Sequence, residues 1–116
     1  KWVLCDRFSD STLAYQGYAR QLDLGIIQEL ERIATNGLLP EITFWLDLPI
    51  EESLIRQGGR NKDRIESEGR NFLAKVAEGF ELLAKERNWI RIAAEMNQSI
   101  VFENIKKSLV NYYSEK

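Results

Sequence analysis

The sequence predicts an α/β fold with a parallel sheet. Three short, mainly apolar runs at residues 2–5, 42–48 and 89–94 are typical of strands buried on both faces. The segments between and after these runs carry apolar residues at helical spacing. Because strands that alternate with helices form parallel sheets, we expect three parallel strands covered by helices.

The two helices between the first and second strands have recognisable ends. Asp10 or Ser11 can cap a short helix that runs through Tyr15 and stops at Gly17. The next helix, within residues 21–37, stops at its Asn-Gly pair. Its apolar face consists of Ile26, Ile27, Leu30, Ile33 and Ala34.

The helices of the second half have similar signals. Pro49 and two following glutamates open a helix that runs to the glycines at 58–59. A polar stretch then continues to about Gly69, and residues 73–84 form a long amphipathic helix. Asn97 or Ser99 caps the last helix, whose apolar face consists of Val101, Ile105, Leu109 and Tyr112.

Composition excludes several classes of function. The 116 residues suffice for one domain, and a net charge of -2 gives no general attraction to nucleic acid or an anionic membrane. Without histidine, zinc sites and histidine general-base chemistry are not expected. The single cysteine, Cys5, excludes an internal disulfide framework, and we expect it to be a small buried residue. No run suits a signal peptide or membrane span, so we expect a cytoplasmic protein.

The first candidate site is the polar stretch 5–18 at the end of the first predicted strand, where parallel sheets bind ligands. Arg7 offers a planar fork to a phosphate or carboxylate, and Asp6 can hold that arginine or reach a metal through water. The alternative is a strand-end ion pair followed by a capped helix. Further side chains that can line the same pocket are Ser11, Thr12, Tyr15 and Gln16.

The second candidate site is the basic stretch 56–70, which follows the Pro49 helix. Two glycines allow this segment to move, and its cations could close over a phosphoryl group during transfer. The alternative is a solvated loop in which the arginines pair with Asp63, Glu66 and Glu68. The cations of the stretch are Arg56, Arg60, Lys62, Arg64 and Arg70.

These two stretches, in this order and about 50 residues apart, resemble the thymidylate kinase family. DRFSDSTLAYQG is similar to the family's acceptor segment, and LPEITFWLDLP to a strand of its second half. GGRNKDRIE is similar to the arginine-bearing lid of the bacterial-type enzymes. The similarity covers nearly the whole chain and is strongest in residues 1–70.

The resemblance implies a parallel three-layer fold, that of the P-loop nucleoside-monophosphate kinases. This chain would be its C-terminal part, a single domain with three strands, an acceptor-binding segment at 5–18 and a lid at about 57–70. The implied reaction transfers the γ-phosphoryl group of ATP to dTMP with Mg²⁺, giving dTDP for dTTP synthesis. The family is usually homodimeric, and the apolar face within residues 10–35 could supply that interface.

The resemblance also assigns roles on the acceptor side. Arg7 would bind the acceptor phosphate and act in catalysis, while Asp6 would orient it and lie near the magnesium water shell. Tyr15 would pack against the deoxyribose. Phe8 stands where the family frequently has tyrosine or histidine. The thymine edge would be approached by Ser11 and Thr12, with Gln16 nearby.

On the ATP side, the lid arginines Arg60 and Arg64 would reach the phosphates as catalytic cations. The lid is a residue shorter than in some relatives, which leaves the choice between Arg60, Lys62 and Arg64 open. Arg56 and the loop after Ala93 and Ala94 would lie near the adenine.

One motif of the family is absent from this sequence, the phosphate-binding loop Gly-x-x-x-x-Gly-Lys-Ser/Thr. We therefore expect the chain to belong to a longer protein and to be inactive by itself. Two alternatives remain open: another P-loop nucleoside or nucleotide kinase, and a non-catalytic nucleotide-binding fragment.

Overall fold

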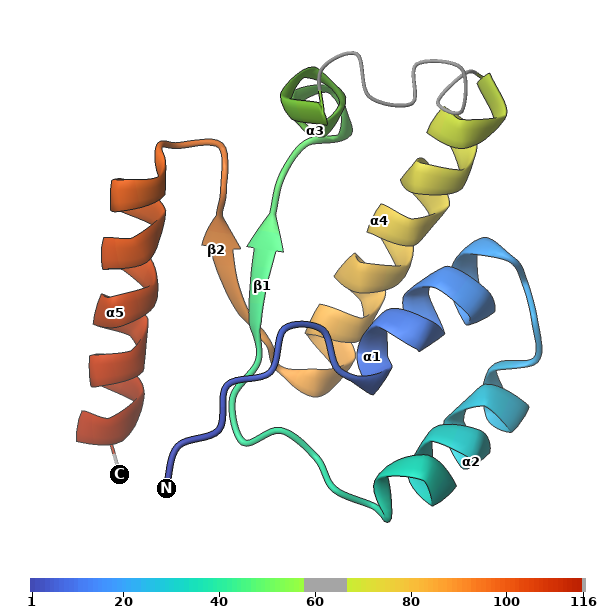
Figure 1. Cartoon of the computed structure of the whole chain (residues 1–116), viewed down its shortest axis with the longest axis horizontal. Coiled ribbons are helices and arrows are strands. Elements are labelled where there is room, and N and C mark those ends of the chain that lie inside the picture. Colours follow the sequence, from blue (N-terminus) through green and yellow to red (C-terminus); the bar gives the residue numbers. More distant parts are fainter. Residues whose placement is uncertain (58–66, 116) are drawn as a thin grey trace.

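The computed structural model describes residues 1–57 and 67–115 (Figure 1). The described part alternates helices with strands, as the sequence predicts, but it has two strands where three were predicted. The strands are β1 (Phe44–Asp47) and β2 (Ile90–Ala93). The helices are α1 (Ser9–Thr12), the π-helix η1 (Leu13–Ala19), α2 (Leu24–Thr35), α3 (Ile50–Gln57), α4 (Ser67–Arg87) and α5 (Gln98–Ser114).

The two strands pair in parallel, which confirms the predicted direction. Phe44 pairs with Ile90 at one end of the ladder, and Asp47 pairs with Ala93 at the other. The Ala94 N–H donates to the Asp47 carbonyl at 2.9 Å, just beyond the last pair. The carboxyl ends of both strands therefore lie at one edge, and the strands lie between α5 and α4 in Figure 1.

The predicted strand at residues 2–5 is wrong for this structure. These residues form no strand; Val3 is 88% exposed, Leu4 is 93% exposed, and Cys5 is exposed rather than buried. A strand needs a neighbour to pair its backbone N–H and C=O groups. Within the described residues the sheet has two strands, and residues 2–5 pair with neither. The expected three-strand sheet is therefore a two-strand sheet here.

The first helix also differs from its prediction. Neither Asp10 nor Ser11 caps it, because its N-cap is Phe8, which makes no side-chain capping bond. The helix does not stop at Gly17 but continues as η1 to Ala19. A Cβ atom at Gly17 would collide with the Leu24 side chain, so this glycine permits close packing on α2 rather than a stop.

Helix α2 begins and ends as local chemistry dictates. The Asp23 carboxylate accepts the Ile26 N–H at 3.1 Å, and Asn36 ends the helix in the left-handed conformation with φ 55°. Only part of the predicted apolar face is buried. Ile27 packs into the core, whereas Ile26, Leu30 and Ile33 remain exposed.

The later helices largely follow their signals. The Ser53 N–H donates to the Pro49 carbonyl at 2.9 Å at the start of α3, and Asn97 caps α5 through a 3.0 Å bond from the Ile100 N–H. Helix α4 begins at Ser67, six residues before the predicted start at 73.

The core lies around η1, which packs against α4 and also against α2. Gly79 allows the closest approach, because an added Cβ atom would lie 2.8 Å from the Tyr18 Cβ atom. Leu13 and Leu83 are the largest fully buried side chains. The remaining buried members of the cluster are Ala14, Ala19, Ile27 and Val76.

Candidate functional site

Arg7 is held in an unusual backbone conformation at the start of the acceptor segment. Its φ of 60° lies in the left-handed region, which a residue with a side chain adopts rarely. Its guanidinium carbon lies over the Tyr15 ring, 5.6 Å from the ring centroid. The turn thus brings together the two side chains that the sequence places eight residues apart. Backbone conformations of this kind cluster at functional sites.

The Tyr15 ring is fixed by aromatic neighbours on α4. Its centroid lies 6.1 Å from that of Phe72 and 6.2 Å from that of Phe80, the latter edge to face. Phe80 in turn contacts Trp89, 6.3 Å away between ring centroids. Tyr15 is therefore half-buried, with one side toward the core and a cation over its ring.

The other acceptor residues occupy one continuous helical run. Ser11 and Gln16 are half-buried and Thr12 is exposed. Residues four apart on a helix lie on the same side, so Ser11 and Tyr15 share a face, as do Thr12 and Gln16. The guanidinium carbon of Arg20, at the end of the run, lies 5.0 Å from the Phe72 ring centroid.

Asp6 is exposed beside Arg7 in the bend before α1. Among the ion pairs of residues 1–56 and 69–115, none joins these two side chains, and Arg7 lies over Tyr15 instead. The structure therefore gives no support to the alternative of a strand-end ion pair.

Asp10, within the predicted acceptor segment, was predicted as a possible helix cap and has a different role in the structure. It is buried, and its carboxylate accepts a hydrogen bond from the Arg87 guanidinium at the end of α4. Burial lowers the pKa of Arg87 below its usual range. The available signal was an acid three and four residues before the apolar residues Leu13 and Ala14, and so on the same helical face. A charge on such a buried face persists only when it is paired.

Arg56 lies at the other candidate region, beyond the carboxyl ends of the strands. Its guanidinium donates to the Glu95 carbonyl at 2.9 Å and to the Met96 carbonyl at 3.5 Å. A further bond of 3.3 Å joins it to the Glu52 carboxylate. Arg56 therefore contacts the loop that follows β2, just after the buried residue Ala94. The resemblance places both Arg56 and this loop near the adenine.

The central part of the predicted lid lies outside the described residues. This includes the candidate cations Arg60, Lys62 and Arg64, together with Asp63 and Glu66 of the solvated-loop alternative. At the lid's described end, Arg70 pairs with Glu51 on α3 at 2.7 Å. Both side chains are more than half exposed, so this pair contributes less than about 1 kcal/mol.

A surface groove lies apart from these residues. A groove of about 390 Å³ between the sheet and α4 is lined by Trp45, Trp89 and the Asp47–Arg91 ion pair, but by no predicted site residue. The described residues contain no group of three or more acidic or thiol side chains suited to a metal. In the same residues, no helix is both long and apolar enough to cross a membrane.

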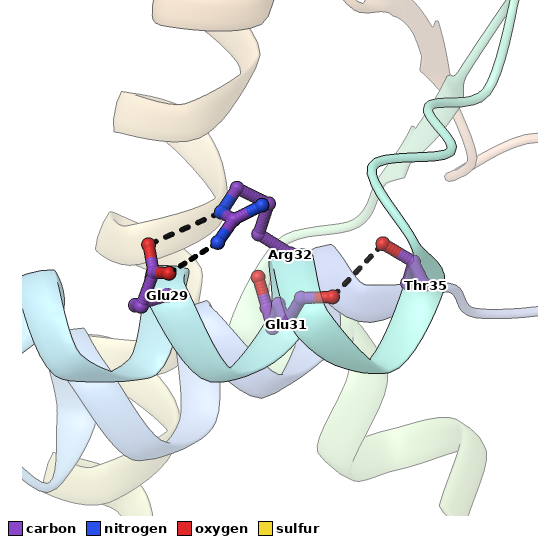
Figure 2. A network of polar contacts seen from close by, with 4 residues as sticks. All are labelled: Glu29, Glu31, Arg32 and Thr35. Atoms are coloured by element: carbon purple, nitrogen blue, oxygen red, sulfur yellow. Dashed lines mark hydrogen bonds and ion pairs between the residues drawn. The ribbon is translucent and has the colours of Figure 1, made fainter.

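Helix α2 carries a polar network on its surface (Figure 2). Arg32 binds both carboxylate oxygens of Glu29, which lowers the pKa of that glutamate. Thr35 donates to the Glu31 carbonyl at 2.8 Å. The Glu31 Oε1 atom is buried with no partner among the described residues, and burial raises the pKa of this carboxyl.

Comparisons with known proteins agree with the motif assignment. The family model described as thymidylate kinase matches residues 1–105. A thymidylate kinase of Prochlorococcus marinus strain MIT 9313 is 54% identical over 112 residues, covering 97% of this chain and 52% of that protein. A thymidylate kinase of Synechococcus sp. strain WH7803 is 55% identical over 108 residues, covering 93% of this chain and 51% of that protein. The chain therefore spans about half the length of the curated relatives it matches.

Proposed function

The chain belongs to the thymidylate kinase family, and from this premise we propose that the whole protein transfers the ATP γ-phosphoryl group to dTMP, giving dTDP for dTTP synthesis. The observation that carries the proposal is the arrangement of the acceptor segment. Arg7 is turned over Tyr15, and the helix behind them presents polar side chains along the same run. This grouping offers a phosphate fork, a flat surface for a sugar and donors for a base within one site.

In this proposal each acceptor residue contacts one part of the nucleotide. Arg7 binds the phosphate in the ground state and neutralises the charge that develops during transfer. Tyr15 packs its fixed ring against the deoxyribose, where a 2′-hydroxyl would be crowded. The thymine edge is read by Ser11, Thr12 and Gln16.

On the ATP side, Arg56 and the loop from Ala94 onward approach the adenine, and the lid cations Arg60 and Arg64 reach the phosphates. Mg²⁺ usually keeps several waters and binds few carboxylates together with substrate phosphates. The exposed Asp6 carboxylate fits such a contact through water, since it stands beside Arg7. When bound, Mg²⁺ would neutralise charge on the transferring phosphoryl group.

Steady-state kinetics of the full-length protein with ATP and a panel of nucleoside monophosphates tests the proposal. We expect dTMP to have the highest kcat/KM, and a non-thymine acceptor in first place would favour another nucleotide kinase. Arg7→Ala should raise KM for dTMP and lower kcat, whereas Arg32→Ala on α2 should leave both unchanged. A full-length protein that binds nucleotide but transfers nothing would favour the non-catalytic alternative.

The lid assignment has its own test. Arg64→Ala should lower kcat by on the order of 10² or more with a smaller effect on acceptor KM, if the guanidinium acts on the transition state. The same measurement on Arg60→Ala and Lys62→Ala ranks the three cations. Unchanged kinetics in Arg64→Ala would assign that arginine to a solvated loop.

We also propose that the protein is a cytoplasmic homodimer. Three large apolar side chains of α2 support the dimer, since Ile26, Leu30 and Ile33 are each at least 60% exposed. Leu30→Glu should convert the full-length protein to a monomer by light scattering without loss of helical circular dichroism. A variant that stays dimeric would exclude this face as the interface.

A further inference from the structure

Asp10 differs from every other polar or charged residue of the described chain in being buried. Its side chain is 9% exposed, against 29% for its partner Arg87. A buried carboxylate loses several kcal/mol of solvation, and a hydrogen-bonded cation offsets this loss. The pair joins residues 77 positions apart, so it connects the acceptor segment directly to the end of α4.

The pair supplies a hydrogen-bonded contact in an interface whose other contacts are mainly apolar and aromatic. The neighbouring contacts between η1 and α4 come from Leu13, Ala14 and Leu83, all fully buried. Burial of apolar surface is non-directional and tolerates small shifts of one helix along another. A hydrogen-bonded ion pair has a preferred geometry, and fixing register is the best-attested use of such pairs.

Among the described residues, no other side-chain hydrogen bond or ion pair holds the start of α1. Phe8 at the N-cap makes no capping bond through its side chain. Asp10 lies in the first turn of α1 and Arg87 in the last turn of α4, so each charge also has the sign that its helix end favours. Arg87 therefore ties the first turn of α1 to the end of α4.

We propose that Asp10 and Arg87 form a positioning pair that holds the acceptor-binding segment in register on α4. The inference rests on the proposed function, because the segment behind Asp10 carries Ser11, Thr12, Tyr15 and Gln16. Loss of the pair moves these side chains and the Arg7 turn relative to the nucleotide monophosphate. Arg56 and the loop after β2 lie on other elements and keep their places.

The test is a kinetic comparison in the full-length protein. Asp10→Asn and Arg87→Met should each raise KM for dTMP on the order of 10-fold, because small misplacements of binding groups have large effects. KM for ATP should stay within about twofold. A purely structural role would lower the folded fraction, and hence the apparent kcat, while leaving both KM values unchanged.

The double variant Asp10→Asn/Arg87→Met separates stability from register. Removing both charges relieves the unpaired buried charge of each single variant, so the unfolding midpoint should recover. KM for dTMP should remain raised, because the directional contact is still missing. Arg87→Lys keeps the positive charge but lacks the planar guanidinium, so its KM for dTMP should be intermediate. If Asp10→Asn does not fold, Arg87→Lys is measured in its place.

Glu29→Gln, which breaks the exposed Glu29–Arg32 pair on α2, is the matched control and should change neither KM. A folded double variant with wild-type KM for dTMP would overturn the positioning role while leaving the proposed function intact. A wild-type protein that does not phosphorylate dTMP would overturn the proposed function, and this inference with it.

Discussion

Gly79 sets the distance between α4 and the helix that carries the acceptor residues, and Gly79→Ala tests that contact. A Cβ atom at this position would lie 2.8 Å from Tyr18 Cβ and 3.0 Å from Tyr18 Cγ. Carbon atoms in ordinary contact are about 3.5–4.0 Å apart, so the two helices must separate by roughly 0.7 Å or more. The Tyr18 Cβ atom is attached to the backbone and cannot rotate away.

The magnitude follows from two opposing effects. Overpacking a well-packed core costs about 1–3 kcal/mol. Replacing glycine by alanine inside a helix contributes about 1 kcal/mol in the other direction. We expect a net loss of about 0–2 kcal/mol, or a Tm lower by up to roughly 8 °C if the full-length protein has about 150–250 residues.

The assay is thermal and denaturant unfolding of the full-length protein, with Ala74→Gly as its control. Ala74 is exposed on the same helix, so its replacement measures helix propensity alone and should cost about 1 kcal/mol. If Gly79→Ala raised stability by a similar amount, the close approach inferred from the structure would be refuted.

Three further predictions concern separate parts of the molecule. Leu83→Ala should destabilise the full-length protein by about 2–5 kcal/mol in denaturant unfolding, since Leu83 is fully buried. Arg56→Ala should raise KM for ATP while leaving KM for dTMP within about twofold, because it removes the bonds to the loop after β2. Glu31→Gln should stabilise the protein relative to wild type as pH rises from 4 to 7. Burial raises the folded-state pKa of Glu31, so the folded protein favours the protonated carboxyl. In the wild type this contribution to stability is fully present below the unfolded-state pKa. It is lost as pH rises through the folded-state pKa, whereas glutamine does not titrate. Unfolding midpoints that differ by the same amount across this pH range would contradict the assignment.

Elements governed by local chemistry could be predicted from the sequence. Asn36 ends α2 and Asn97 begins α5, because each of these signals acts within one helical turn. The parallel direction of β1 and β2 followed from the alternation of strands with helices. The family also followed, because two specific motifs stood in the right order and at the right separation.

Features that depend on distant partners could not be predicted in the same way. Residues 2–5 read as a strand by composition, but a strand also needs a paired neighbour, which the described residues do not provide. Asp10 was predicted to cap a helix, because its actual partner, Arg87, lies 77 residues away on another helix. Gly17 was predicted to stop the helix, because the Leu24 side chain that packs closely against it comes from the next helix.

Helix α4 connects the two candidate regions, and its ends are held differently. Its 21 residues span about 30 Å, from Ser67 beside the predicted lid to Arg87 beside Asp10, and the predicted acceptor segment lies along it. At the Ser67 end, the Arg70–Glu51 pair is exposed and therefore weak, whereas at the Arg87 end the pair with Asp10 is largely buried. The aromatic side chains along its middle, Phe72 and Phe80, contact Tyr15 itself. The predicted acceptor segment is thus firmly tied to α4. Under the proposed function, substitutions on that helix should therefore affect dTMP binding before they affect ATP binding.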